Sequence, residues 1–383
     1  NISISASLMI VVIAAFWVWR SWYIASETLH ANAQDKTERI EAIYRANFDH
    51  LGAFLTQLAA VIGNEVGIGA LFYEAGLAVK KEGGGAGGAE AARLRKSMYE
   101  RYQSVWQAVS EDGELRQLHF HLPPATSFLR FHRPDLFGDD LMETRPMVVA
   151  ANRDRIKAHG IEAGLVAGGI RGVVPVSHEL DDGSVVHVGS VEVGTTLTSM
   201  LQRMSEETGA QFAILVDEAH MRNRFLPEVF ARWTRNGPTY DGYRLMVSTD
   251  DAFAGKLLKA LGGGVSGGRQ PDVITEVGDQ TIAVVSLSVR NYEGERNPSK
   301  PNIGGIFAWF PMDDAVLTYK RDIAEAVVIA IFVVFFLGVM LFFALGQEQK
   351  LALQRKASMT DALTGVSNRR HFDEVLNAEI RRA

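Results

Sequence analysis

The stretch "IRGVVPVSHELDDGSVVHVGSVEVG", residues 170–194, contains two valine-rich runs separated by a polar segment. In each run apolar residues alternate with polar or small ones, which is typical of β-strands. Asp182 and Gly183 lie between the runs, and this pair is common in hairpin turns because glycine tolerates the positive φ angle that such turns require. The sequence therefore predicts an antiparallel hairpin here.

Similar short runs lie on both sides of the hairpin. They have the sequences "LRQLHFHL", "AQFAILVDE", "RLMVST", "DVITEVGDQTIAVVSLSV" and "GGIFAWFPM". The segment "LTSMLQRMSEETG", residues 197–209, predicts a helix that ends at a glycine and separates two sets of strands. We therefore predict two α+β lobes, at about residues 110–200 and 208–315. Within the second lobe, "LGGGVSGGRQ" and the following Pro271 and Asp272 indicate a mobile loop.

A long amphipathic helix is predicted before the sheets. Apolar residues recur there at steps of three and four with charges between them, as in a helix with one buried face. They are Ile40, Tyr44, Phe48, Leu51, Leu55, Leu58 and Ile62. "GGGAGG", residues 83–88, then predicts a flexible loop, and "EAARLRKSMYERYQSVWQAV" predicts a second helix.

Two apolar runs are long enough to cross a bilayer, which takes about 20 residues of helix. "AVVIAIFVVFFLGVMLFFALG", residues 326–346, contains no charged residue. "ISISASLMIVVIAAFWVW", residues 2–19, contains serines and is followed by an arginine and two aromatic residues, which favour a membrane interface. A cleaved signal peptide is the alternative for this run. We predict transmembrane helices at residues 1–24 and 324–346.

Basic residues decide the expected orientation in the membrane. Lys350, Arg355 and Lys356 follow the second apolar run, whereas the basic residues before it are balanced by acidic ones. Lysine and arginine near a span favour the cytoplasmic side. We therefore expect a multi-pass protein of the bacterial inner membrane, with its C-terminal end in the cytoplasm and residues 25–320 in the periplasm.

The composition excludes some classes of function. The chain has 383 residues, a net charge of −6 and no cysteine. This charge gives no reason to expect a nucleic acid as partner, and the absence of cysteine excludes disulfides, thiol chemistry and Cys-ligated zinc. The sequence contains no phosphate-binding loop of the Walker type and no His-Glu-x-x-His pattern.

Residues 115–154, "LRQLHFHLPPATSFLRFHRPDLFGDDLMETRPMVVAANRD", lead into the hairpin, and both stretches resemble the membrane-distal lobe of the double-Cache family of bacterial sensory domains. The resemblance extends from about Glu27 to Lys320. It implies a two-lobed α+β fold with PAS-like antiparallel sheets on a long N-terminal helix, here flanked by two transmembrane helices. It also implies that the distal lobe holds a small periplasmic ligand.

Histidines and arginines in this stretch are candidate ligand contacts. His119 and His121 alternate along one expected strand, so their side chains share a face of it. Arg130 and His132 follow after a bend at two prolines. Convergent imidazoles and a guanidinium suit a carboxylate, a phosphate or another anion. In the structural alternative, these groups form hydrogen bonds that hold the loop "RFHRPDLFGDD" closed.

Further charged residues can join this group. Asp139, Asp140 and Arg145 can pair with it, and Arg171 lies in the next expected strand. The candidate ligand contacts are His119, His121, Arg130, His132, Asp139, Arg145 and Arg171. A His-x-His metal site is an alternative, but no carboxylate lies at a defined offset from the two histidines. No metal ligand is therefore assigned.

The segment after the second apolar run has a different pattern. Residues 347–359 favour a helix, which we expect to be a cytoplasmic signalling helix. Asp361 and Thr364 can cap backbone groups, Gly365 permits a bend, and Ser367 or Asn368 can begin a further helix. The apolar stripe of that helix is Phe372, Val375, Leu376 and Ile380. Because a stripe of this kind needs a covering surface, we expect the helix to belong to a domain that is cut off here.

This turn resembles the start of the GGDEF domain of diguanylate cyclases, which reads Asp-x-Leu-Thr-Gly-x-x-Asn-Arg-Arg-x-Phe. The matching positions are Asp361, Leu363, Thr364, Gly365, Asn368, Arg369, Arg370 and Phe372. The resemblance implies that residues 360–383 are the N-terminal fragment of such a domain. The catalytic loop and metal-binding aspartate of that family do not occur in this sequence, so no catalytic residue and no cofactor is assigned to this chain. Mg²⁺ and GTP are expected only for the intact cyclase.

Together these features predict a homodimeric transmembrane receptor. It would sense a small periplasmic ligand and regulate the synthesis of cyclic di-GMP from two GTP, which requires two nucleotides to be aligned with metal ions. One alternative is a receptor with a degenerate GGDEF output or a fused phosphodiesterase. Another is a chemoreceptor-like sensor, which is disfavoured because no long heptad array follows the second span.

Overall fold

The computed structural model describes residues 2–111, 115–163, 168–235, 239–240, 242–261, 273–359, 361 and 364–382. Internal contacts divide the chain into two units, which are Ala33–Asp313 and Asn1–Asn32 with Asp314–Ala383. The mobile loop predicted at residues 261–272 lies outside the described residues except for Leu261.

The unit that contains both chain ends is helical. It comprises the first part of α1 (Ile2–Gly63), nearly all of α10 (Asp313–Met359), and α11 (Arg369–Ile380). Large apolar side chains such as Phe16 and Phe335 are exposed along α1 and α10. By length and composition both helices can cross a membrane, which fits membrane anchoring.

The turn before α11 has the predicted caps. The Asp361 carboxylate accepts hydrogen bonds from the N–H and hydroxyl of Thr364, and Gly365 has a φ of 69°. Asn368 is the N-cap of α11, because its side-chain oxygen accepts a hydrogen bond from the N–H of His371. Leu363 lies outside the described residues. The apolar stripe of α11 is exposed, with Phe372, Val375, Leu376 and Ile380 between 47% and 64% accessible.

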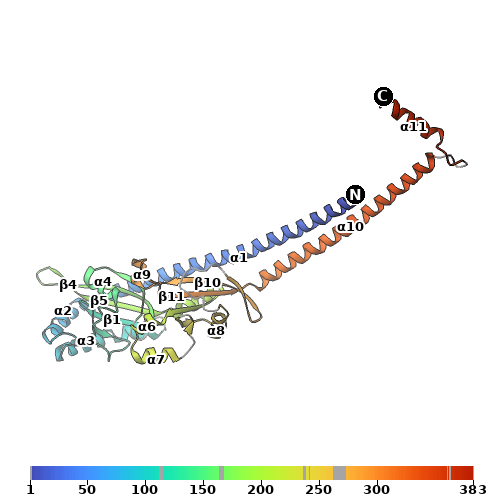
Figure 1. The fold of residues 1–383 in the computed structure, drawn as a ribbon. Helices are drawn as coiled ribbons and strands as arrows, with labels where there is room; N and C mark the ends of the chain where they lie inside the picture. Colours follow the sequence, from blue (N-terminus) through green and yellow to red (C-terminus); the bar gives the residue numbers. More distant parts are fainter. Residues whose placement is uncertain are drawn as a thin grey trace. The chain divides into compact units, whose positions relative to one another are not determined.

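The first sheet of the larger unit has five antiparallel strands in the order β2-β1-β5-β4-β3. Figure 1 labels three of them, β1, β4 and β5. They are β1 (Gln117–Leu122), β2 (Thr126–Arg130), β3 (Ala158–Ala163), β4 (Gly168–Glu179) and β5 (Val185–Thr196). The β4–β5 hairpin confirms the prediction for residues 170–194. In its turn Asp182 accepts hydrogen bonds from Ser184, and Gly183 has a φ of 80°.

Helices cover one face of this sheet. They are α1, α2 (Ile68–Lys81) and α3 (Ala89–Glu111). Phe72 of α2 and Tyr102 of α3 pack on Phe120 of β1, with ring centroids 5.5 and 6.3 Å apart. Gly172 lets β4 approach α1 closely, because a Cβ atom there would lie 2.4 Å from the backbone nitrogen of Thr56. The amphipathic helix predicted from the apolar spacing is thus confirmed.

The run "GGGAGG" lies between two helices, as predicted. It forms a closed turn between α2 and α3 in which Gly83, Gly84, Gly85 and Gly87 have positive φ. The Glu82 carboxylate fixes this turn by accepting hydrogen bonds from the first N–H groups of α3. An acidic side chain at a helix N-terminus is favourable because these N–H groups have no partner within the helix.

The other face of the first sheet lies under α4 (Pro146–Asp154) and the segment before it. A small apolar core joins them, and its buried residues are Ala125, Leu141, Met147, Val148, Ala150, Ala151, Ala158, Val173 and Tyr292. The rest of this face carries polar side chains, which form the site described below.

The second sheet has six antiparallel strands in the order β7-β8-β6-β11-β10-β9. They are β6 (Gln211–Asp217), β7 (Thr239–Tyr240), β8 (Tyr243–Ser248), β9 (Val273–Val277), β10 (Gln280–Val289) and β11 (Gly304–Pro311). The predicted linking helix, α5 (Leu197–Thr208), ends at Gly209 with a φ of 68°.

Short helices complete the second lobe. They are α6 (Glu218–Arg222), α7 (Pro227–Arg235), α8 (Asp251–Ala260) and α9 (Tyr292–Arg296). α8 packs on one face of the second sheet, where Phe253 stacks on Trp309 at 5.8 Å. The amine of Lys36 in α1 lies 4.4 Å from the ring of Phe310, the next residue of β11. The mixed helix and sheet fold with a long N-terminal helix confirms the predicted fold class.

Candidate ligand-binding site

One face of the first sheet is polar because of the strand register. His119 of β1 is paired with Glu192 of β5, and His121 is paired with Ser190. Alternate residues of a strand share a face, so Gln117 joins this set. The polar residues of β1 and β5 therefore project from the face opposite α2 and α3.

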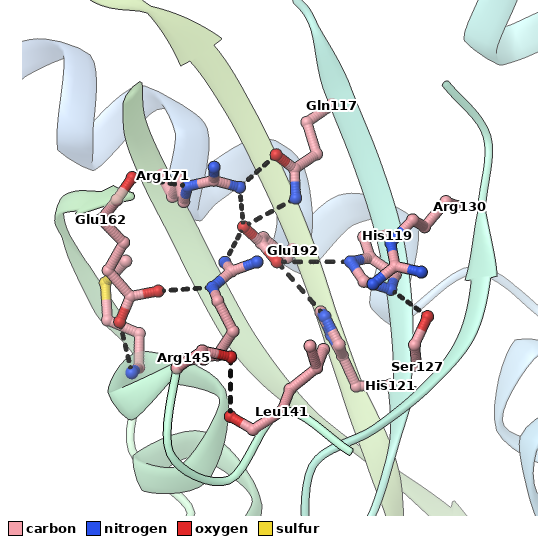
Figure 2. Close-up of polar contacts among 12 residues, drawn as sticks. Gln117, His119, His121, Ser127, Arg130, Leu141, Arg145, Glu162, Arg171 and Glu192 are labelled. Atoms are coloured by element: carbon pink, nitrogen blue, oxygen red, sulfur yellow. Dashed lines mark hydrogen bonds and ion pairs between the residues drawn. The ribbon is translucent and has the colours of Figure 1, made fainter. Parts of the chain in front are cut away.

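Glu192 is at the centre of a buried network of charges (Figure 2). Its Oε1 accepts hydrogen bonds from Arg145, from Nη1 of Arg171 at 2.7 Å, and from Nε2 of Gln117 at 3.0 Å. The Nε of Arg145 also donates to Glu162 at 2.8 Å. The two guanidinium groups and two carboxylates balance in charge, which is the condition for burying them.

The ionisation of Glu192 follows from these contacts. Burial raises the pKa of this carboxyl, but Arg145 and Arg171 outweigh burial and hold its pKa well below the ordinary value. Glu192 is therefore an anion at neutral pH. Removing either arginine would leave a buried charge without its full set of partners.

The two histidines lie on the other side of Glu192. Their ring centroids are 3.8 Å apart, and Nε2 of His119 lies 2.8 Å from the hydroxyl of Ser127. Burial, more than the nearby charges, lowers the pKa of both imidazoles. Both rings are therefore neutral at physiological pH.

Arg130 has the structural role that the sequence left open. Its guanidinium makes a bidentate ion pair with the carboxylate of Asp139, at 2.8 and 2.7 Å, and donates a further hydrogen bond to the carbonyl of Leu136. These contacts close the loop between Phe131 and Asp139. Asp140 does not join the group in the described structure, because its exposed carboxylate caps the N–H of Met142.

A cavity of about 180 Å³ adjoins this network. Its lining residues are Arg116, Gln117, Arg130, His132, Arg133, Leu136, Leu141, Thr144, Arg145, Ala163, Gly168, Gly169, Arg171, Gly194, Thr195, Thr196 and Arg224. Among the described residues, six arginines and a histidine border the cavity and no carboxylate does. We call it the arginine cavity.

The second lobe contributes one wall of the arginine cavity. Arg224 follows α6, and its Nη1 donates a hydrogen bond of 2.9 Å to the carbonyl of Glu143 in the first lobe. Neither Arg224 nor Arg116 makes an ion pair with a carboxylate of the described residues, whereas the other four arginines do. These two cations are the most available for a ligand.

The predicted site residues converge. Each of them either belongs to the buried network or lines the cavity. They are His119, His121, Arg130, His132, Asp139, Arg145 and Arg171. The sequence did not reveal Gln117, Glu162, Glu192, Arg116 and Arg224. One signal for Glu192 was present, because a lone carboxylate in the apolar run "SVEVG" needs a buried partner.

Two antiparallel sheets behind one long helix, with a buried polar network beside a cavity that both lobes line, define a two-lobed α+β unit. Residues 84–296, more than half of the chain, match the family dCache_3, described as the double sensory domain of two-component sensor kinases. The chain belongs to this family, which confirms the double-Cache resemblance.

Solved structures of sensory domains are similar at low identity. The periplasmic domain of LuxQ from Vibrio cholerae is 10% identical, with 72% of this chain and 99% of that one covered and a TM-score of 0.39. The ligand-binding domain of the Campylobacter jejuni chemoreceptor Tlp3, in complex with 4-methylisoleucine, is 11% identical, with 76% and 94% covered and a TM-score of 0.39.

The sensor domain of the histidine kinase DctB from V. cholerae is 11% identical, with 74% of this chain and 98% of that one covered and a TM-score of 0.39. A comparison with curated proteins gives no match. The family assignment therefore rests on the sequence match of residues 84–296.

Proposed function

We propose that this chain is the receptor part of a membrane-anchored sensor that binds a small anion in the arginine cavity and regulates a diguanylate cyclase domain at its C-terminal end. The observation that carries the binding proposal is the cavity lining of six arginines without a described carboxylate. Guanidinium groups bind carboxylates and phosphates through paired, charge-assisted hydrogen bonds.

The size of the cavity limits the ligand. A volume of about 180 Å³ has room for a small organic acid or a phosphate-sized ion. Thr144 and Thr195 also line the cavity, and a threonine hydroxyl is able to bind the polar part of such a ligand.

A first prediction concerns the two arginines without an ion pair. We expect the double substitution Arg116→Gln and Arg224→Gln to weaken binding of the anion by tenfold or more, because each arginine can supply a charge-assisted hydrogen bond worth about 1.5–3 kcal/mol. The measurement is a thermal-shift screen of the purified chain with organic acids and phosphate, followed by calorimetric titration of each hit.

Arg232→Gln is the matched control, because Arg232 is an exposed arginine of α7 outside the arginine cavity. It also removes a positive charge, one instead of the two that the double variant removes, and should leave the affinity unchanged. Amines and purines are tested beside the acids. Stabilisation by amines alone would contradict an anion site.

The output part of the proposal is supported by the turn before α11. Asp361, Gly365 and Asn368 occupy the capping and bend positions of the motif that resembles the start of a GGDEF domain. α11 presents an exposed apolar stripe, which needs a covering surface. In addition, only Met312 separates the sheet strand β11 from α10, so a shift of the second sheet would be transmitted along the helix.

The basic residues after the second apolar run support a cytoplasmic location of α11 in this proposal, with the sensory lobes in the periplasm. A homodimer would bring two cyclase domains together, as the joining of two GTP molecules requires. Ligand binding can change the output only if the ligand prefers one arrangement of the helices over another.

A second prediction concerns this output. A chain extended through the following domain is expected to convert GTP to cyclic di-GMP in the presence of Mg²⁺, at a rate that changes when the anion binds. The product is measured by chromatography with and without the anion. Cyclic di-GMP hydrolysis would instead indicate a fused phosphodiesterase, and binding without turnover a degenerate output domain. If neither occurs, the chemoreceptor-like alternative gains support.

A further inference from the structure

The two histidines and Glu192 form a compact group of donor atoms. Nε2 of His121 lies 3.3 Å and Nδ1 of His119 lies 3.8 Å from Oε2 of Glu192. One donor atom from each residue can be chosen so that all lie within 4.8 Å of one another. Two ligand atoms of a tetrahedral zinc ion, each at about 2.0–2.1 Å from the metal, lie about 3.4 Å apart. The spacing therefore nearly matches that of a metal site.

Four nitrogen and oxygen atoms of this group are buried and have no hydrogen-bond partner among the described residues. They are Nδ1 of His119, Nδ1 and Nε2 of His121, and Oε2 of Glu192. The contact of 3.3 Å between Nε2 of His121 and Oε2 of Glu192 is longer than an ordinary N–H···O hydrogen bond. Buried polar atoms without partners are costly, so a group of four in one place needs an explanation.

In His119 and Glu192, the donor atom that faces away from the group is fixed by contacts with other side chains. Nε2 of His119 lies against the hydroxyl of Ser127, and Oε1 of Glu192 accepts from Arg145, Arg171 and Gln117. Figure 2 shows that Oε2 of Glu192 is directed toward both imidazoles. Metal ligands are commonly oriented in this way, by a second hydrogen bond on the side away from the metal.

We propose that His119, His121 and Glu192 bind one transition-metal ion of the zinc class. Neutral imidazoles and one carboxylate oxygen favour Zn²⁺, Co²⁺ or Ni²⁺ over Ca²⁺ and Mg²⁺, which prefer oxygen ligands alone. The His-x-His pattern suggested a metal site only as an alternative, because the carboxylate comes from a strand about 70 residues later in the sequence.

The charges around the group determine what else must bind. Arg130, Arg145 and Arg171 are balanced by Asp139, Glu162 and Glu192. A divalent ion adds two positive charges to this neutral set, so the fourth metal position is expected to take an anion such as hydroxide or chloride. The metal site does not depend on the proposed anion sensing, because none of its three ligands lines the arginine cavity.

The test titrates the full chain in detergent, purified without a histidine tag and stripped with a chelator, with Co²⁺ and then with Zn²⁺. We expect one equivalent of Co²⁺ to give the visible absorption bands of a tetrahedral complex, and Zn²⁺ to displace it. X-ray absorption at the zinc edge should then show two imidazole ligands. A wild-type chain without such bands and without bound zinc would overturn the proposal.

His121→Gln is expected to weaken Zn²⁺ binding by about 100-fold while the side chain keeps a similar size. His187→Gln is the matched control, since His187 lies on β5 of the same sheet but its Nε2 contacts Oδ1 of Asn152 at 3.1 Å instead of the group. Circular dichroism checks that both variants fold. If both variants lost zinc equally, or neither did, the assigned ligands would be wrong. The anion titration is also carried out with a chelator present, so that anion binding is measured without metal. Failure of the metal proposal can then be told apart from failure of anion sensing.

Discussion

Replacing Arg145 with methionine is expected to lower the free energy of unfolding of the two-lobed unit, Ala33–Asp313, by about 3–5 kcal/mol. The guanidinium of Arg145 bonds to Glu162 and Glu192, and all three side chains are at least 95% buried. Without it two carboxylates remain in the interior with too few partners. The measurement is urea denaturation of the purified chain, together with its unfolding temperature, which should fall by about 10 °C.

Arg153→Met is the control for this prediction. Arg153 also pairs with a carboxylate, that of Asp154, but its side chain is 73% exposed. An exposed pair contributes about 0–1 kcal/mol, so this variant should unfold almost as the wild type does. Adding Glu162→Gln to the Arg145 variant removes one of the stranded charges and should recover part of the loss. Equal effects of the two arginine substitutions would contradict a buried network.

Replacing Gly172 with valine is expected to destabilise the same unit by about 3 kcal/mol. A Cβ atom at Gly172 would lie 2.4 Å from the backbone nitrogen of Thr56 and 2.6 Å from the carbonyl carbon of Leu55. Both contacts are to backbone atoms of α1, so no side-chain rotation can relieve them. The helix would have to move away from β4 and give up apolar contacts with the sheet.

The free energy of unfolding is again measured by denaturation. Gly255→Ala provides the comparison, because Gly255 lies inside α8 and a Cβ atom there would meet nothing within 4 Å. That substitution should stabilise the protein by about 0.5–1 kcal/mol, since alanine loses less conformational freedom than glycine in a helix. A Gly172 variant as stable as the wild type would show that α1 does not pack closely on β4.

Several elements of the fold could be predicted because their signals are local. Asp182 and Gly183 form the hairpin turn, Gly209 ends α5, and Asn368 begins α11, each through contacts with residues close by in the chain. The two apolar runs likewise need only their own length and composition to indicate membrane helices. The glycine run at residues 83–88 indicated a loop but not the capping role of Glu82, which depends on the geometry of the closed turn.

For the candidate site, the sequence by itself determined that His119 and His121 share a strand face, because side chains alternate along any β-strand. Only the tertiary structure decided what faces them. The strand order places β5 beside β1, which brings Glu192 to the histidines across about 70 residues of chain, and Arg224 reaches the cavity from the second lobe. Alternation is a local property of the backbone, whereas strand order and register are chosen by the packing of the whole sheet. For this reason the pairing of buried charges could not be predicted from residue spacing.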